Sequence, residues 1–253
     1  MHIAISHSEK EDAKQAAEEA FFHLNADMPG APHLLLVYYT DTMDAHTIGN
    51  VLSRLTPGTP IHGGSSHLGI MTDRGFIPGK PEVLGLFGIY DPQGQFGISL
   101  RRFDKNPQQS GAEAVRASLK NAGRPGESPP FVWIASTPGR EEEILTGIES
   151  VLGPNVPIIG GSAADKTISG NRSILGNGTS CKQGVVVSSI FPSTEPGFSF
   201  HCGFSPTSFC GVASKTEGRI LQEIDGRPAA TVYNEWTGGS INPILPQGGN
   251  VLE

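Results

Sequence analysis

The chain has 253 residues, a length that can bury a substantial core as one large domain or two medium ones. Apolar residues make up 37% of the sequence and charged residues 17%, which excludes a disordered chain. The net charge of -7, with scattered lysines and arginines, excludes a nucleic-acid-binding protein, because phosphate backbones require a basic stripe.

The N-terminal residues and the cysteines favour a cytoplasmic location and no membrane partner. Residues 1–6 have neither the basic start nor the long apolar run of a secretory signal. The apolar stretch Leu34–Tyr39 is too short to span a bilayer. Cys181, Cys202 and Cys210 are odd in number and lack C-x-x-C spacing, so we expect them to be reduced thiols.

The first elements in chain order are two helices that alternate with short strands. A capping box at Ser8–Glu11 precedes a run of apolar residues at helical spacing that ends at Leu24. A buried strand is expected at Leu34–Tyr39. A second apolar stripe, from Ile48 to Leu55, predicts another helix before the segment Pro-Ile-His-Gly-Gly-Ser, residues 60–65.

The same order then returns. Ser110–Glu113 predicts the next helix start, Phe131–Ala135 a strand, and Thr137-Pro138 the start of a helix whose apolar stripe ends at Leu152. Pro-Ile-Ile-Gly-Gly-Ser follows at residues 157–162. Each half is expected to end in an antiparallel strand pair extending its own sheet: Val83–Tyr90 with Phe96–Phe103, and Gly184–Phe191 with Phe198–Phe204.

Constant spacing between these elements predicts an internal duplication. The first glycines of the two Gly-Gly-Ser segments, Gly63 and Gly160, are 97 residues apart, and so are the strand starts Leu34 and Phe131. We therefore expect an α/β (mixed α+β) fold, internally duplicated, with mixed sheets packed together and helices outside, around a pseudo-two-fold axis. The expected halves are residues 1–107 and 108–206.

Two motifs resemble a known family. Pro-Ile-x-Gly-Gly-Ser before a strand hairpin, together with Ile224–Ala229 leading into Val232–Trp236, resembles the N-terminal region of the FIST domain (F-box and intracellular signal-transduction proteins). The resemblance implies a sensory domain that binds a small polar metabolite, with amino acids among the suggested ligands, and a signalling partner. It implies no catalytic residues and no cofactor. Residues 207–253 would be the start of the family's C-terminal region, in truncated form.

The Gly-Gly-Ser segments are the best candidates for ligand binding, because paired glycines expose backbone N–H groups and serine adds a hydroxyl. The ligand-binding residues we predict are Gly63, Gly64, Ser65, Ser66, His67, Asp73, Arg74, Gly160, Gly161, Ser162 and Asp165. Arg74 or Lys166 would be the counter-charge for a carboxylate. The alternative is that the glycines serve close strand packing, and that Asp73 and Asp165 cap turns.

Other chemistry is less well supported by the residues. A hydrolase or transferase could use Ser65 with His67 and Asp73, but residues two apart on a strand rarely align as nucleophile and base. Cys181 could pair with His67 or His201, and His62, His67 and Asp73 could bind a metal, although that spacing is weak. The third possibility is an interaction scaffold. Tyr233 and Trp236, three apart on a predicted helix, are more typical of a core or an interface.

Overall fold

A computed structural model describes residues 1–103, 106–167, 170–197, 199 and 202–245. The chain divides into two compact units, residues 1–197 and 198–253. Among the described residues, the larger unit carries two mixed sheets, a separate hairpin and four helices, and the smaller unit carries a three-stranded sheet and one helix. Within the described ranges, every helix is too short or too polar to cross a bilayer.

The two sheets of the larger unit have related strand orders, β1-β6-β2-β3-β10-β11 and β7-β12-β8-β9. The strands of the first are β1 (His2–Ser8), β6 (Leu84–Tyr90), β2 (Leu34–Thr40), β3 (Ile61–Ser66), β10 (Ile174–Gly176) and β11 (Thr179–Cys181). The strands of the second are β7 (Gln95–Arg102), β12 (Gly184–Phe191), β8 (Phe131–Ser136) and β9 (Ile158–Ser162). β2 pairs with β3 and β8 with β9 in parallel, and the other pairs are antiparallel.

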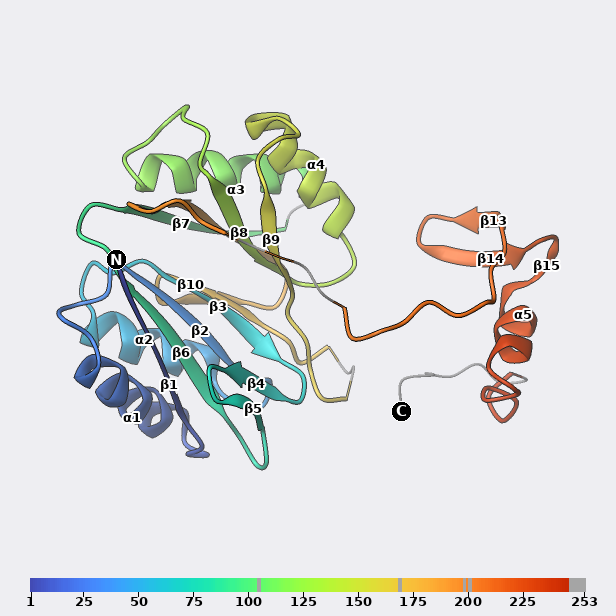
Figure 1. The fold of residues 1–253 in the computed structure, drawn as a ribbon, viewed down its shortest axis with the longest axis horizontal. Helices are drawn as coiled ribbons and strands as arrows, with labels where there is room; N and C mark the ends of the chain where they lie inside the picture. Colours follow the sequence, from blue (N-terminus) through green and yellow to red (C-terminus); the bar gives the residue numbers. More distant parts are fainter. Residues whose placement is uncertain (104–105, 168–169, 198, 200–201, 246–253) are drawn as a thin grey trace. The chain divides into compact units, whose positions relative to one another are not determined.

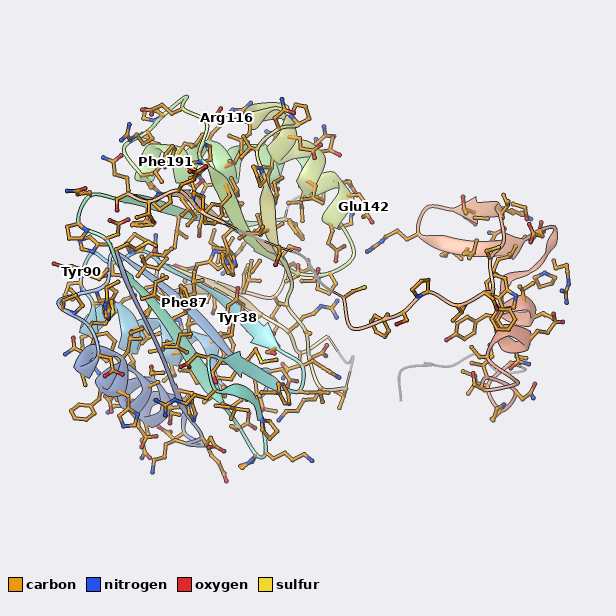
Figure 2. All side chains as sticks on the ribbon, in the orientation of Figure 1. Tyr38, Phe87, Tyr90, Arg116, Glu142 and Phe191 are labelled. Atoms are coloured by element: carbon orange, nitrogen blue, oxygen red, sulfur yellow. The ribbon has the colours of Figure 1, made fainter. Side chains whose placement is uncertain are left out.

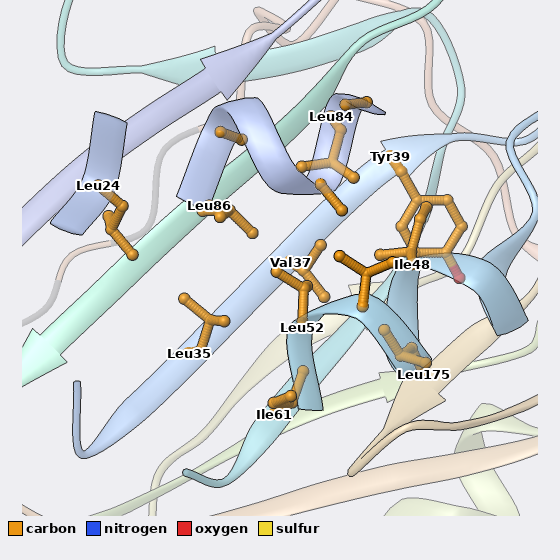
Figure 3. Packing of buried hydrophobic residues seen from close by; sticks show 14 of the residues in the cluster. Leu24, Leu35, Val37, Tyr39, Ile48, Leu52, Ile61, Leu84, Leu86 and Leu175 are labelled. Carbon is orange, nitrogen blue, oxygen red and sulfur yellow. The ribbon is translucent and has the colours of Figure 1, made fainter. Parts of the chain in front are cut away.

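The helices lie on the outer faces of the two sheets, as predicted (Figure 1). The helices are α1 (Ala13–Ala26) and α2 (Ala45–Leu55) over the first sheet, and α3 (Pro107–Asn121) and α4 (Glu141–Leu152) over the second. Figure 3 shows the core under α1 and α2, where Leu35 and Val37 of β2 meet Ile48 and Leu52 of α2. The expected α/β class is confirmed.

The inner faces of the two sheets pack against each other. Leu36 of β2 shares one apolar cluster with Ile98 of β7 and Val186 of β12. Tyr38 and Phe87 project from the first sheet into this layer (Figure 2). The indole Nε1–H of Trp133 on β8 donates to the Tyr38 hydroxyl at 3.0 Å, so a polar bond also joins the sheets.

Two helix starts differ from the predicted capping boxes. Asp12 caps α1 by accepting from the Gln15 N–H, because Ser8 is still part of β1. Asn106 caps α3, so that Ser110 lies one turn inside the helix. A different short polar side chain therefore caps each helix, four residues after the predicted cap in α1 and four residues before it in α3.

A third helix start, that of α4, is later than predicted. α4 begins at Glu141 rather than at Pro138. The Thr137 N–H donates to the carbonyl of Gly184, so the chain is still held against β12 at that point. Three glutamates occupy the first turn of α4, where acidic side chains suit the helix dipole.

The strand Phe96–Phe103 does not extend the first half's sheet, and that prediction is wrong. β7 pairs along its whole length with β12, so the chain crosses to the second sheet after β6. The N-terminal strand β1, which sequence reasoning missed, pairs with β6 in the same way. Each half thus runs strand, helix, strand, helix, strand, hairpin, strand, and this order favours a boundary at residues 91–94 rather than 107.

The hairpin β4 (Gly69–Thr72) and β5 (Gly75–Pro78) belongs to the first half. The predicted strand Phe198–Phe204 includes residues 198, 200 and 201, which lie outside the described residues. The smaller unit contains β13 (Ala213–Glu217), β14 (Ile220–Ile224), β15 (Arg227–Pro228) and α5 (Ala229–Trp236). α5 is the helix predicted to carry Tyr233 and Trp236, and the Trp236 ring stacks on Phe209.

Candidate functional site

The first glycine of each Gly-Gly-Ser segment allows close packing of two parallel strands. A Cβ on Gly63 would lie 2.0 Å from the carbonyl oxygen of Val37, and one on Gly160 would lie 1.9 Å from that of Ile134. Gly160 also has a φ of 134°. The first contact lies between β3 and its parallel neighbour β2, and the second between β9 and its parallel neighbour β8. The alternative that these glycines serve close strand packing therefore holds in both halves.

The next two residues of the first segment face the second half of the chain. A Cβ on Gly64 would lie 3.6 Å from the Cβ of Ala163. Ser65 is buried, and its hydroxyl donates to the carbonyl of Ala164 at 2.8 Å and accepts from the Ser173 N–H at 3.1 Å. The hydroxyl predicted to bind a ligand is therefore engaged in joining the halves.

The remaining predicted residues of the first half do not lie together at one site. Ser66 donates to the carbonyl of Gly69, and His67 Nδ1 lies 2.6 Å from the carbonyl oxygen of Asp165. Asp73 and Arg74 form the turn of the β4–β5 hairpin. They line a different cavity of about 610 Å³, together with His7, His23 and residues of β1 and α1.

In the second half, the predicted residues lie on an edge strand and its loop. Gly160, Gly161 and Ser162 are exposed, and Ser162 donates to Glu141 at 2.6 Å. Asp165 is buried and accepts from the backbone N–H groups of Gly170 and Asn171, as expected for a residue that orders a loop. Ser65 is buried whereas Ser162 is exposed, so the two Gly-Gly-Ser segments have different surroundings.

The groups considered for catalysis or metal binding are engaged elsewhere. Among the described residues, no hydrogen bond joins Ser65 to His67, and no cluster of three histidine, cysteine or acidic side chains could hold a metal ion. His62 is buried and bonds Ser188 at 2.7 Å. Burial raises the pKa of the Cys181 thiol, which disfavours a thiolate, and His201 lies outside the described residues.

A polar cavity that sequence reasoning missed lies at the carboxyl end of β2. Its volume is about 660 Å³, which suits a small molecule. Its lining comes from the β2–α2 loop, the end of β7, and the segment around β10–β11, so both halves contribute. The lining residues are Asp41, Thr42, Met43, Asp44, Ala45, Arg102, Phe103, Asn171, Ser173, Ser180, Cys181, Lys182 and Gln183.

Asp41 is the unusual residue of this cavity. The residue is only 8% exposed, and its Oδ1 has no hydrogen-bond partner among the described residues. A buried carboxylate oxygen normally has a donor, because the lost hydration costs on the order of 1–3 kcal/mol or more. Its backbone is held in place, since Asn171 donates its side-chain N–H to the Asp41 carbonyl at 3.1 Å.

The other charged groups of the cavity are of both signs. Asp44 caps α2 by accepting from the Thr47 N–H, and the hydrogen bonds from Thr47 lower the pKa of this carboxyl. Arg102 and Lys182 supply positive charge, and Lys182 donates to the Asn171 side chain at 3.1 Å. The lining of one cavity thus includes Asp41, whose Oδ1 has no hydrogen-bond partner among the described residues, and two cationic side chains.

The signal for this cavity was present in the sequence. Asp41-Thr-Met-Asp44 directly follows a buried strand and precedes a helix, and α/β sheets bind ligands outside the carboxyl ends of their strands. The contribution of Asn171 and Lys182 to the cavity could not be predicted from the sequence, because it depends on the pairing of β10 with β3.

Comparison with known proteins gives one clear match. The family model of the FIST N domain matches residues 33–227. Two solved structures of cyanuric acid hydrolase, one of them from A. caulinodans, align at TM-scores of 0.35, with 11% and 9% identity. Each alignment covers 75% of this chain, and the chain covers 67% and 66% of theirs; no curated protein matches.

The TM-scores of these structural alignments are too low to support an argument about function. The FIST match, in contrast, spans most of the chain and includes both Gly-Gly-Ser segments and the turn before α5. FIST domains are sensory domains of signal-transduction proteins. The chain belongs to the FIST N domain family.

Proposed function

We propose that this domain senses a small zwitterionic metabolite, an amino acid, in the cavity at the carboxyl end of β2. The observation that carries the proposal is the buried Asp41 Oδ1 without a hydrogen-bond partner in the described part of the chain. A ligand ammonium group would supply the missing donor in a charge-assisted bond.

The opposite charge of an amino acid is matched by the same cavity. Arg102 and Lys182 line it, and the N-terminus of α2 begins there at Ala45. Cationic side chains and helix N-termini both favour a carboxylate. A ligand with one charged group of each sign therefore fits better than a simple cation or anion.

The proposed route of signal transmission rests on the fact that residues of both halves line the cavity. Asp41 belongs to the first half, whereas Asn171 and Lys182 belong to the second. A ligand that contacts both would favour one arrangement of the halves over another. We propose that a signalling partner, or the family's C-terminal region, reads that arrangement in the cytoplasm.

The test is calorimetric titration of the whole chain with a panel of amino acids, and with amine-only and acid-only analogues of any that binds. We expect an amino acid to bind and both analogues to bind at least about tenfold more weakly, because each lacks one charge-assisted bond. Asp41→Asn should weaken binding by roughly 10- to 100-fold.

Asp73→Asn is the matched control, because Asp73 lines the other cavity. It should leave the affinity unchanged. Absence of binding across the panel would overturn the proposal, and so would an Asp41→Asn variant that binds as tightly as the original chain.

A further inference from the structure

The two strands that carry Gly-Gly-Ser differ in what lies at their outer edges. β3 has β2 on one side and β10 on the other, with Leu175 opposite Gly63 and Ile174 opposite Gly64. β9 has β8 on one side. Among the described residues, no strand pairs with its other side.

The free edge of β9 presents the same backbone groups that β3 uses. On β3, the Ser65 N–H donates to Ser173 and the carbonyl of Ile61 accepts from Asn177. The residues 97 positions later are Ser162 and Ile158. The N–H of Ala163 points the other way, to the carbonyl of Ser136, which places the outer groups of residues 158, 160 and 162 on the free edge.

The β4–β5 hairpin is the first half's counterpart of β10–β11. Each hairpin follows a Gly-Gly-Ser strand and closes with a two-residue turn, between Thr72 and Gly75 in one case and between Gly176 and Thr179 in the other. Superposing the turns places Met71 at the position of Leu175. In the described part of the chain, the edge of β4 that faces away from β5 pairs with no strand.

Burial shows what this missing pairing leaves uncovered. Leu175 is 0% exposed and belongs to the core under α2 (Figure 3), whereas Met71 is 74% exposed. Ile61, beside Gly63, is buried, whereas its counterpart Ile158, beside Gly160, is half-buried. The pairing of β10 with β3 therefore buries Leu175 and Ile61, whereas their counterparts Met71 on β4 and Ile158 on β9 are more exposed.

We propose that the β4–β5 hairpin of one copy of this chain adds to the β9 edge of a second copy. The pairing would be antiparallel, with Met71 opposite Gly160 and Thr72 opposite Ile159, as in the internal pair of β10 with β3. Strand addition to an exposed edge is a common mode of association, and the backbone hydrogen bonds would satisfy both edges.

The second copy is the occupant favoured by the chain itself, because each copy holds one unused hairpin and one unused edge of matching type. The contact is head-to-tail, since the hairpin of one copy meets a different surface on the next. Such contacts close into rings or continue as longer assemblies. Ligand binding at Asp41 plays no part in this inference.

The first test is light scattering of the whole chain over a dilution series. We expect concentration-dependent association, which Met71→Asp should weaken at least about tenfold because it would desolvate a charge in the new pair. Phe22→Asp is the matched control, since Phe22 is a 72% exposed apolar residue of α1 and should leave association unchanged. A chain that stays monomeric at every concentration would overturn the proposal.

The second test fixes the register. Thr72→Cys and Ile159→Cys are combined in a variant whose native Cys181, Cys202 and Cys210 are replaced by serine. Oxidation should link separate chains, seen as bands of twice the chain mass or more on a non-reducing gel, while either single variant should give far less. A disulfide formed only within one chain would show that the hairpin covers its own β9, and would contradict a second copy as the occupant.

Discussion

His62 shows how one buried side chain sets the pH dependence of stability. It lies between the two sheets, with Nδ1 on Ser188 and with Nε2 lacking a hydrogen-bond partner among the described residues. Burial lowers the pKa of His62 from 6.5 to about 3. Its residue counterpart in the second half, 97 positions later, is the apolar Ile159, so the imidazole is a feature of the first half alone.

We predict that stability falls as the pH drops below 6.5. The unfolded chain then binds a proton at His62 that the folded chain excludes, so the free energy of unfolding decreases by about 1.4 kcal/mol per pH unit. From pH 7 to pH 5, His62 should account for a loss of about 2 kcal/mol, measured by urea denaturation. This contribution ends near pH 3, where folded His62 also titrates.

The variant that isolates this effect is His62→Leu combined with Ser188→Ala, which removes both partners of the buried hydrogen bond. It should lose most of the difference between pH 7 and pH 5. His46→Gln changes an exposed histidine on α2 and should keep the full difference. An unchanged pH profile in the double variant would show that other groups are responsible.

At the scale of elements, the contact between β3 and the segment after β9 joins the halves. Ser65 makes two side-chain and two backbone hydrogen bonds to Ala164 and Ser173. Its counterpart Ser162 is exposed on the edge strand and bonds Glu141 instead. Identical motifs therefore have different energetic roles, because β10 covers only one of the two strands.

We predict that Ser65→Ala lowers the free energy of unfolding by roughly 1–3 kcal/mol, because the carbonyl of Ala164 and the N–H of Ser173, both on half-buried residues, each lose a partner. Ser162→Ala is the matched comparison and should change stability by about 0.5 kcal/mol or less, as for other exposed positions. Chemical denaturation of both variants measures the difference. Equal effects would contradict the assignment of Ser65 as the joining residue.

At the scale of the whole molecule, the second half contributes a hairpin to the sheet of the first half. β10 and β11 come from the second half but complete the first sheet, and Leu175 fills the core under α2. A first half that lacked this hairpin would expose the outer edge of β3 and an apolar cavity above it. The two halves have the same topology, but the first half depends on the hairpin that the second half supplies.

We predict that fragment 1–197 folds by itself, whereas fragments 1–93 and 94–197 do not when separate. The reason is that 1–197 is one compact unit, while each smaller fragment loses the layer between the sheets. Circular dichroism and amide NMR dispersion distinguish the cases. A well-dispersed spectrum from fragment 1–93 would contradict this account.

The sequence by itself determined the local elements and their order. The strands β2, β8 and β12, the four packed helices and the 97-residue spacing all follow from apolar periodicity, which depends only on near neighbours in the chain. The family resemblance followed from the same short motifs and was confirmed over residues 33–227. The helix starts were wrong by a few residues, because several polar residues could serve as caps.

Only the tertiary structure decided which elements share a sheet. Whether β7 returns to β6 or crosses to β12 depends on long-range pairing, for which the turn at Pro92–Gly94 is equally suitable. The same holds for β10 and β3, and that pairing removed Ser65 from the candidate site and assembled the cavity around Asp41. Spacing along the chain revealed two similar halves, but the hydrogen bonds available at each strand edge made one Gly-Gly-Ser segment buried and left the other exposed.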